Sequence, residues 1–255
     1  MKKILLLFAS KSNKKTYDKI KERLQGTAFD LRIYSAHKTP KELEDFLLEH
    51  SQEYSCIIAG AGLAAHLAGV IAAKTTLPVI GVPCADNLEG LDSLLSTLQM
   101  PPGIPVLTTG VECTQEAAEN AQKIANLKVE QVTIVIKTGH AEKAADMLRK
   151  LGIKYEFSYS MTDDPLIIRF VELDEIAQTQ KKKGICIYCP VALKTSSKDS
   201  LKLLEIKNGL WVGINRAENA AIAAAQILGS QGIQEIRKEF ARQVLEANEN
   251  ESRDI

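Results

Sequence analysis

Two histidines in the first third of the chain are the residues best suited to carry a proton. His37 stands in the polar segment 35–40, and His66 follows the glycine-rich segment 60–62. An imidazole titrates near neutral pH, so it can accept and release a proton during a reaction. A lone histidine is usually structural, but each of these two follows a short apolar run, which favours a shared catalytic role.

Two loops near these histidines could bind an anionic ligand. Ser10-Lys11-Ser12-Asn13 offers two hydroxyls and an amide that suit a phosphate or a sugar, although simple helix capping explains the same residues. Gly60-Ala61-Gly62-Leu63-Ala64-Ala65 matches a permissive dinucleotide pattern, but the next apolar run ends in Gly81-Val82-Pro83, without the acidic residue that would hold a ribose. This second loop therefore favours either a small anionic ligand or a purely structural turn.

Other residues that stand out favour structural roles. Cys186-Ile187-Tyr188-Cys189 has the C-x-x-C spacing, but it lies in an apolar run, where residues three apart point to opposite faces of a strand. No second cysteine pair completes a zinc site. The run Lys181-Lys182-Lys183 predicts a solvated turn, and we expect His50 and His140 at the surface.

The composition is that of a globular protein and argues against several partners. The 255 residues are 45% hydrophobic and include 32 basic and 32 acidic residues, so no nucleic-acid partner is expected. No stretch approaches the roughly 18 apolar residues that a membrane span needs. The apolar run near the N-terminus is too short for a signal peptide, and five scattered cysteines fit a reducing compartment, so we expect a cytoplasmic location.

Short apolar runs alternate with amphipathic stretches in the first half of the chain. The runs that predict strands are 4–8, 31–34, 56–59, 79–82 and 105–108. The stretches that predict helices are 14–24, a helix from Pro40, 64–74, 88–98 and 114–127. This alternation predicts an α/β fold with a parallel sheet covered by helices on both faces. The polar loops and both histidines would then lie at the carboxyl ends of the strands, where ligands bind.

The second half repeats parts of the first. Two pairs of segments are related by the same offset in the sequence. Gly81-Val82-Pro83 corresponds to Tyr188-Cys189-Pro190, and Asp92-Ser93-Leu94 corresponds to Asp199-Ser200-Leu201. The middle of the second copy is short, because about one strand and the polar run 178–183 replace a helix, a strand and a helix. We interpret the chain as a tandem duplication. One irregular α/β domain is the alternative interpretation.

The duplication sets the expected domain boundaries. We expect a first domain over residues 1–128 and a degenerate second domain over residues 129–255, with an exposed join near 126–130. The amphipathic segment 234–248 would form a helical arm at the end of the second domain.

Four motifs of the first copy come in the order and spacing of one known family. They are Ser10-Lys11-Ser12, Ser35-Ala36-His37-Lys38-Thr39-Pro40, Gly60-Ala61-Gly62-Leu63-Ala64-Ala65-His66-Leu67 and Gln99-Met100-Pro101-Pro102-Gly103-Ile104-Pro105-Val106. Residues 3–127 closely resemble the N5-carboxyaminoimidazole ribonucleotide mutase (PurE) family of purine biosynthesis. The resemblance implies a flavodoxin-like three-layer sandwich. It also implies transfer of a carboxylate from the exocyclic nitrogen to ring carbon C4 of an imidazole ribonucleotide, without a metal or organic cofactor.

The resemblance also implies roles for individual residues. His37 would move the proton, and His66 would line the carboxylate side of the site. The backbone of Gly60, Ala61 and Gly62 would receive the carboxylate or carbon dioxide, and the loop 85–90 would be a mobile lid. The residues implied to hold the phosphate and ribose are Ser10, Ser12, Asn13, Ser35 and Lys38.

Several positions depart from the family pattern. Asn13 replaces a usual aspartate, and Ala9 and Leu63 replace usual glycines. Ala68 replaces a usual proline. Lys38 replaces the usual arginine of the mutases and is more typical of relatives that carboxylate with free carbon dioxide. Two alternatives therefore stay open, namely a direct carboxylase and a nucleotide-binding or assembly subunit that has lost catalysis.

The second copy resembles the same fold, but its site motifs are gone. Thr162 stands where the first copy has His37. Mutases of this family form octamers of single-copy chains, so a chain with two copies implies a homotetramer with pseudo-octameric symmetry. The closing helix 219–228 and the arm 234–248 would pack between subunits.

Overall fold

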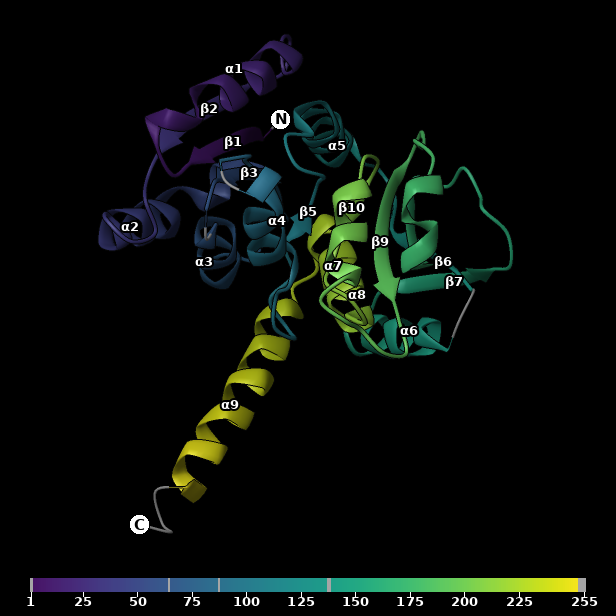
Figure 1. Ribbon diagram of the computed structural model, residues 1–255. Helices are drawn as coiled ribbons and strands as arrows, with labels where there is room; N and C mark the ends of the chain where they lie inside the picture. The colour runs from purple at the N-terminus through teal and green to yellow at the C-terminus, as the bar shows by residue number, and fades with distance from the viewer. Residues whose placement is uncertain (1, 64, 87, 137–138, 252–255) are drawn as a thin grey trace.

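One sheet of ten strands runs through the computed structural model, which describes residues 2–63, 65–86, 88–136 and 139–251. The strand order is β2-β1-β3-β4-β5-β10-β9-β8-β6-β7. Figure 1 shows β2 and β1 at one side of the molecule and β6 and β7 at the other. The strands are β1 Lys3–Phe8, β2 Phe29–Ile33, β3 Tyr54–Ala61, β4 Val79–Pro83, β5 Leu107–Thr108, β6 Gln131–Val135, β7 Lys154–Ser158, β8 Leu166–Glu172, β9 Ile185–Val191 and β10 Leu210–Trp211. The α-helices are α1 Lys14–Arg23, α2 Pro40–His50, α3 His66–Lys74, α4 Leu91–Leu98, α5 Thr114–Asn126, α6 His140–Lys150, α7 Asp199–Lys202, α8 Ala217–Ile227 and α9 Ile233–Glu251.

The first half, residues 2–128, contains a parallel sheet in the order β2-β1-β3-β4-β5. Strand β1 is buried on both faces, as its uninterrupted apolar run predicts. One face of this strand packs against α1 and α5, and the other packs against the side chains of α2 and α3. Three layers and this strand order define a flavodoxin-like sandwich, which confirms the predicted fold class.

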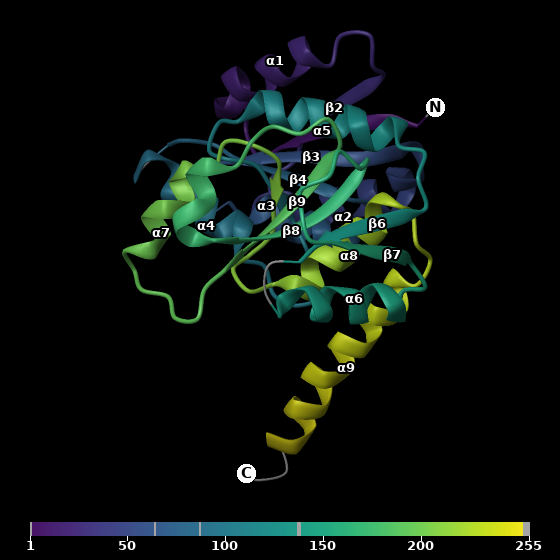
Figure 2. The same cartoon turned by 90° about the vertical axis from the view of Figure 1, so that its right-hand side faces the viewer.

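The second half, residues 129–251, arranges its strands in the corresponding order β7-β6-β8-β9-β10. These strands are parallel to one another, and β10 joins the first half by pairing antiparallel with β5. Helices α6 and α8 cover one face (Figure 2). From the second half itself, the other face carries only α7 and short 3-10 segments, and α4 of the first half also packs on it; no helix is described between β7 and β8. The second half is therefore shorter in its middle, as the sequence predicts.

Both halves bend the backbone in the same way after their last strand. Glu112 follows β5 with φ of 53°, and its N–H donates to the carbonyl of Pro83 at 3.0 Å. Asn215 follows β10 with φ of 58°, and its N–H donates to the carbonyl of Pro190 at 2.8 Å. A left-handed residue is rare outside glycine. The two halves thus share an unusual turn as well as a strand order.

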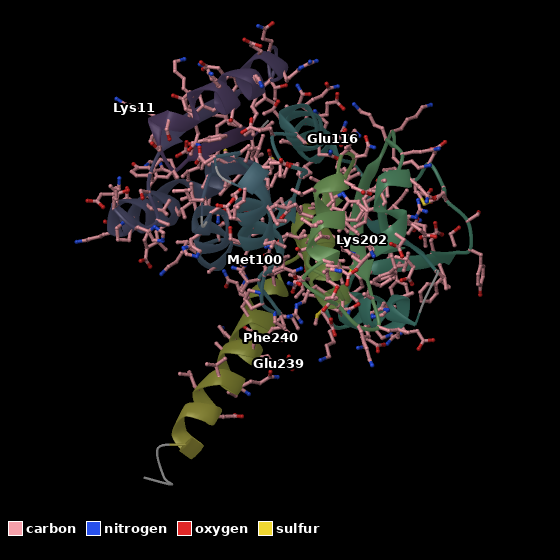
Figure 3. All side chains as sticks on the ribbon, in the orientation of Figure 1. Lys11, Met100, Glu116, Lys202, Glu239 and Phe240 are labelled. Carbon is pink, nitrogen blue, oxygen red and sulfur yellow. The ribbon has the colours of Figure 1, made fainter. Side chains whose placement is uncertain are left out.

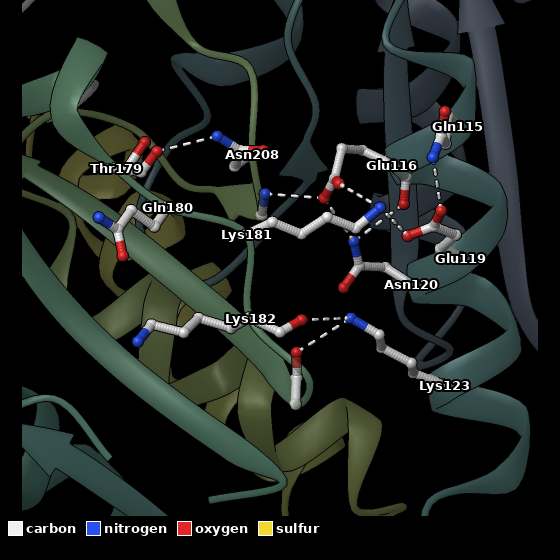
Figure 4. Close-up of polar contacts among 12 residues, drawn as sticks. Gln115, Glu116, Glu119, Asn120, Lys123, Thr179, Gln180, Lys181, Lys182 and Asn208 are labelled. Atoms are coloured by element: carbon white, nitrogen blue, oxygen red, sulfur yellow. Dashed lines mark hydrogen bonds and ion pairs between the residues drawn. The ribbon is translucent and has the colours of Figure 1, made fainter. Parts of the chain in front are cut away.

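A polar network joins the first half to the second (Figure 4). Glu116 on α5 is buried, and its carboxylate accepts a hydrogen bond from the N–H of Gly209 at 2.9 Å. Lys181 forms ion pairs with Glu119 at 2.5 Å and with Glu116 at 3.7 Å. Lys181 is exposed and lies outside the helices and strands, as predicted for a solvated turn, and the acidic face of α5 beside it supplies its ion-pair partners. Lys123 is also held there by the carbonyl of Lys182.

Some predicted boundaries are also wrong. The helix predicted over 88–98 begins at Leu91, because Leu88, Glu89 and Gly90 all have positive φ and cannot continue an α-helix. The strand predicted over 105–108 is limited to Leu107–Thr108. Cys186 and Cys189 belong to different hydrophobic clusters on opposite faces of β9, which confirms their structural interpretation.

Helix α9 extends away from the rest of the molecule (Figures 1 and 2). It packs at its beginning, where Ile236 is buried and the ring of Phe240 lies against Gly103 (Figure 3). Further along, Val244 and Leu245 are 70% and 61% exposed. Within the described residues, no helix is long and apolar enough to cross a membrane.

Candidate active site

The imidazole rings of His37 and His66 meet at the carboxyl ends of β2 and β3. The distance from His37 Nε2 to His66 Nδ1 is 2.9 Å, and the two ring planes are at 81° to each other. This distance is that of a hydrogen bond, so one nitrogen donates a proton and the other accepts it. Both side chains are exposed, which leaves the pair accessible to a ligand. The structure therefore brings together the two residues that the sequence selects for proton transfer.

The loop after β2 positions His37 through side-chain hydrogen bonds to its backbone. Ser35 Oγ accepts from the N–H groups of His37 and Lys38 at 3.3 and 3.2 Å. The N–H of Ser35 donates to Thr39 Oγ1 at 2.9 Å. Serine and threonine favour such turns because their hydroxyls replace backbone partners. Pro40 then begins α2, as its fixed φ predicts.

The loop after β3 brings the backbone close to the histidine pair. Gly60 lies against the ring of Phe8, and Gly62 lies under the carboxylate of Asp86, so a Cβ atom at either glycine would overlap its neighbour. Leu63 has φ of 56° and is 52% exposed. Ala64 lies outside the described residues. Helix α3 begins at His66, so this side chain lies at the mouth of the loop.

A cavity of about 230 Å³ lies between the two loops. Of the residues predicted to form the site, Ser35, His37, Ala61, Gly62 and His66 line this cavity. The other lining residues are Ala9, Ala36, Leu63 and Leu67. The cavity thus combines two imidazoles with a largely apolar wall.

The remaining predicted binding residues do not line this cavity. The side chain of Ser10 accepts a hydrogen bond from the N–H of Ser12 at 3.1 Å, which is helix capping. Asn13 is only 6% exposed, whereas Lys38 is exposed. Gly60 lies at the edge of the site, where its carbonyl accepts from the N–H of Ala9 at 3.1 Å. Contacts of these residues with a phosphate and ribose stay predictions.

Sequence reasoning missed an acidic residue beside this edge. Glu112 follows β5, and its carboxylate accepts from the hydroxyl of Thr16 at 3.0 Å and from the N–H of Ala85 at 3.2 Å. Glu112 therefore ties α1 to the start of the predicted lid 85–90, in which residue 87 lies outside the described residues. An acidic residue shortly after a predicted strand was the available signal.

Among the described residues, the Cys84 thiol is not ionised and no cluster of metal-ligating side chains is found. Burial raises the pKa of Cys84, which follows β4, to about 12, so this thiol stays protonated at neutral pH. The described residues contain no group of three or more metal-ligating side chains. The arrangement can therefore move a proton between imidazoles and a ligand in a small cavity.

The fold and the site together define a flavodoxin-like α/β protein with a small-ligand site where the strand order reverses, between β1 and β3. Within this class, the family model described as AIR carboxylase matches residues 3–145. The chain belongs to this family. The match covers the first half and the beginning of the second.

Relatives in this family span most of the first half. The N5-carboxyaminoimidazole ribonucleotide mutase of Methanocaldococcus jannaschii is 44% identical over 131 residues, which are 51% of this chain and 82% of that protein. The mutase of Saccharolobus solfataricus is 38% identical over 156 residues, 58% of this chain and 96% of that protein. The phosphoribosylaminoimidazole carboxylase of Candida albicans is 50% identical over 101 residues, 39% of this chain and 18% of that protein.

Proposed function

We propose that the first half converts N5-carboxyaminoimidazole ribonucleotide to 4-carboxyaminoimidazole ribonucleotide in purine biosynthesis. The observation that carries this proposal is the contact of 2.9 Å between His37 and His66 at the carboxyl edge of a sheet in the AIR carboxylase family. Mutases that are 38–44% identical to this chain support the choice of substrate. The reaction would need no metal or organic cofactor, because only a carboxylate and a proton move.

The proposed reaction has two steps, and His37 gives up one proton in the first step and takes one back in the second. The bond between the exocyclic nitrogen and its carboxylate breaks, carbon dioxide is released, and His37 gives the nitrogen a proton. Ring carbon C4 then attacks carbon dioxide and loses its hydrogen, which His37 takes back. His66, hydrogen-bonded to His37, would orient the ring and stabilise its charged form. Ser10, Ser12 and Lys38 would hold the phosphate and ribose.

The cavity suits an intermediate that must not escape. Its volume of about 230 Å³ admits a small group, and the apolar side chains of Leu63 and Leu67 line it. An apolar wall excludes water and keeps carbon dioxide next to C4. The predicted lid 85–90 would complete the enclosure.

Replacement of His37 by asparagine tests this mechanism. An amide can donate a hydrogen bond but cannot carry the proton, so we expect kcat to fall by about 10²-fold or more while nucleotide affinity is kept. His50→Asn is the matched control, because the His50 ring lies beside Phe46, Glu49 and Glu53 and does not line the cavity. A His37→Asn enzyme that retains more than about a tenth of the wild-type rate would exclude the proton-transfer role.

Direct carboxylation is the second candidate function. Lys38 departs from the arginine that the family resemblance implies for mutases, and the related Candida albicans protein is named a phosphoribosylaminoimidazole carboxylase. Turnover of aminoimidazole ribonucleotide with bicarbonate at low concentration would favour this candidate. Turnover of the N5-carboxy compound alone would favour the mutase, and no turnover of either would favour a non-catalytic homologue.

We also propose that the chain is a duplication with domains over residues 1–128 and 129–255. The matching strand orders and the matching bends at Glu112 and Asn215 support this division. Four such chains would form the homotetramer with pseudo-octameric symmetry, in the cytoplasm. The exposed Val244 and Leu245 on α9 support a subunit contact there. Light scattering should then give about four times the chain mass of 28.0 kDa.

A further inference from the structure

The second half has a cavity of its own where its strand order reverses. This cavity of about 390 Å³ lies at the carboxyl ends of β6, β8 and β9. Its walls come from the beginning of α6, from the end of β8 and from the segment that follows β9. The lining residues are Gly139, His140, Lys143, Glu172, Val191, Ala192 and Leu193. The cavity occupies the place where α/β sheets of this kind bind ligands, and it shares no residue with the histidine cavity of the first half.

Three ionisable side chains from two elements converge on this cavity. Lys143 and His140 come from α6, and Glu172 ends β8. Among the residues that the structure describes, neither Lys143 nor Glu172 forms an ion pair, and both are exposed. The residue His140 is partly exposed, and the centroid of its ring lies 6.1 Å from that of the buried ring of Phe170. His140, expected at the surface, thus lines a cavity that opens there.

The opposite wall of the cavity is apolar. Val191 is buried at the end of β9, Ala192 is partly buried, and Leu193 is 104% exposed at the rim. A fully exposed leucine beside a lysine and a glutamate gives the cavity one apolar side and one charged side. Ligand sites in proteins combine these two properties, and the volume falls in their usual range of about 300–1,000 Å³.

We propose that this cavity binds a nucleoside monophosphate. Lys143 and His140 would bind the phosphate, because an ammonium and an imidazole both donate hydrogen bonds to phosphate oxygens. The carboxylate of Glu172 would accept from ribose hydroxyls, a role that acidic residues take at strand ends. The base would lie on Val191 and Leu193. The second half thus binds a nucleotide without the proton-transfer residues of the first half, and this binding does not depend on which reaction the first half catalyses.

Calorimetric titration of the full chain with adenosine monophosphate tests the proposal. Ser12→Asp is the background variant, because a carboxylate in the predicted phosphate loop of the first half repels a nucleotide there. We expect one molecule to bind per Ser12→Asp chain. Lys143→Gln in this background should weaken binding at least about tenfold, because a charged hydrogen bond to phosphate is lost. Lys150→Gln at the exposed end of the same helix is the matched control and should leave the affinity unchanged.

A second variant guards against misfolding of Lys143→Gln. Leu193→Glu changes a fully exposed side chain, so the fold is kept, and its charge at the rim should also weaken binding about tenfold. Adenosine and inorganic phosphate serve as partial ligands, and each should bind more weakly than the monophosphate. Absence of binding to Ser12→Asp at millimolar nucleotide, or equal affinities of the Lys143, Leu193 and Lys150 variants, would overturn the proposal. Turnover by the His37 site is measured separately in Lys143→Gln and should be unchanged.

Discussion

Asn219 is the residue whose loss should most clearly separate the two halves. It lies near the start of α8 and is 1% exposed. Its Oδ1 accepts from the N–H of Gly103 at 2.9 Å, and its Nδ2 donates to the carbonyl of Pro101 at 2.9 Å. The side chain thus fixes the segment that leads into β5, more than a hundred positions earlier in the chain. Glu116 of the first half makes a corresponding contact to the second half, because its carboxylate accepts a hydrogen bond from the N–H of Gly209, just before β10.

The expected cost of Asn219→Ala follows from these two hydrogen bonds. The N–H of Gly103 is buried and would have no partner, which costs about 1–3 kcal/mol. The carbonyl of Pro101 would lose the hydrogen bond that Asn219 Nδ2 donates, and this loss costs about 1 kcal/mol. The free energy of unfolding should therefore fall by about 3 kcal/mol. For a chain of this size that corresponds to a decrease in Tm of roughly 6–12 °C.

Thermal and urea denaturation measure this change. Asn126→Ala is the matched control, because Asn126 is exposed and bonds only to the carbonyl of Gln122 within α5. That control should change the free energy of unfolding by less than about 0.5 kcal/mol. Equal stability of the Asn219→Ala and Asn126→Ala proteins would refute the inference that Asn219 holds the halves together.

Two further perturbations test the site and the core. Gly60→Ala should lower both stability and turnover, because its methyl group would overlap the ring of Phe8. A variant with unchanged stability and unchanged turnover would contradict this packing. Four buried thiols have a pKa raised to about 12 by burial, whereas an unfolded thiol ionises near 8.5; they are Cys56, Cys84, Cys186 and Cys189. The contribution of these protonated thiols to the free energy of unfolding is complete below about pH 8.5 and is lost as the pH rises towards 12. The loss is up to about 1.4 kcal/mol per thiol and pH unit. Urea midpoints that stay constant from about pH 8 to pH 11 would contradict this expected loss.

The histidine site could be predicted because it depends on local patterns. The apolar runs that became β2 and β3 indicate parallel strands, and parallel strands bring their carboxyl ends to one edge. His37 and His66 follow those ends closely, so their contact required no knowledge of distant packing. The start of α2 at Pro40 and the capping role of Ser10 were likewise local.

The junction of the halves could not be predicted, because it depends on contacts between distant residues. Nothing near Glu116 in the sequence indicates that its carboxylate accepts from Gly209, and nothing near Lys181 indicates that it pairs with Glu119. The left-handed Leu63 also lacks a local signal, since leucine is disfavoured at positive φ and is held there by the surrounding loop.

The way in which α4 packs explains why the first half should not be stable without the second. Leu94 and Leu98 on α4 are fully buried in the hydrophobic cluster that contains Tyr188 and Trp211 of the second half. Helix α4 thus covers part of the face where the second half has only α7 and short segments. Truncation after Lys128 would expose both leucines, and each loses about 1.5–3 kcal/mol of burial.

That loss is a large fraction of the roughly 5–15 kcal/mol that stabilises a typical domain. We therefore expect the fragment 1–128 to be insoluble or inactive, although it contains the whole histidine site. Expression of this fragment beside the full chain, followed by sedimentation and the turnover assay, measures the effect. A matched fragment that carries Leu94→Gln and Leu98→Gln should be more soluble than the plain fragment, because its newly exposed face is polar. A plain fragment that is soluble, assembled and fully active would show that the second half is dispensable, and the covering role of α4 would then be wrong.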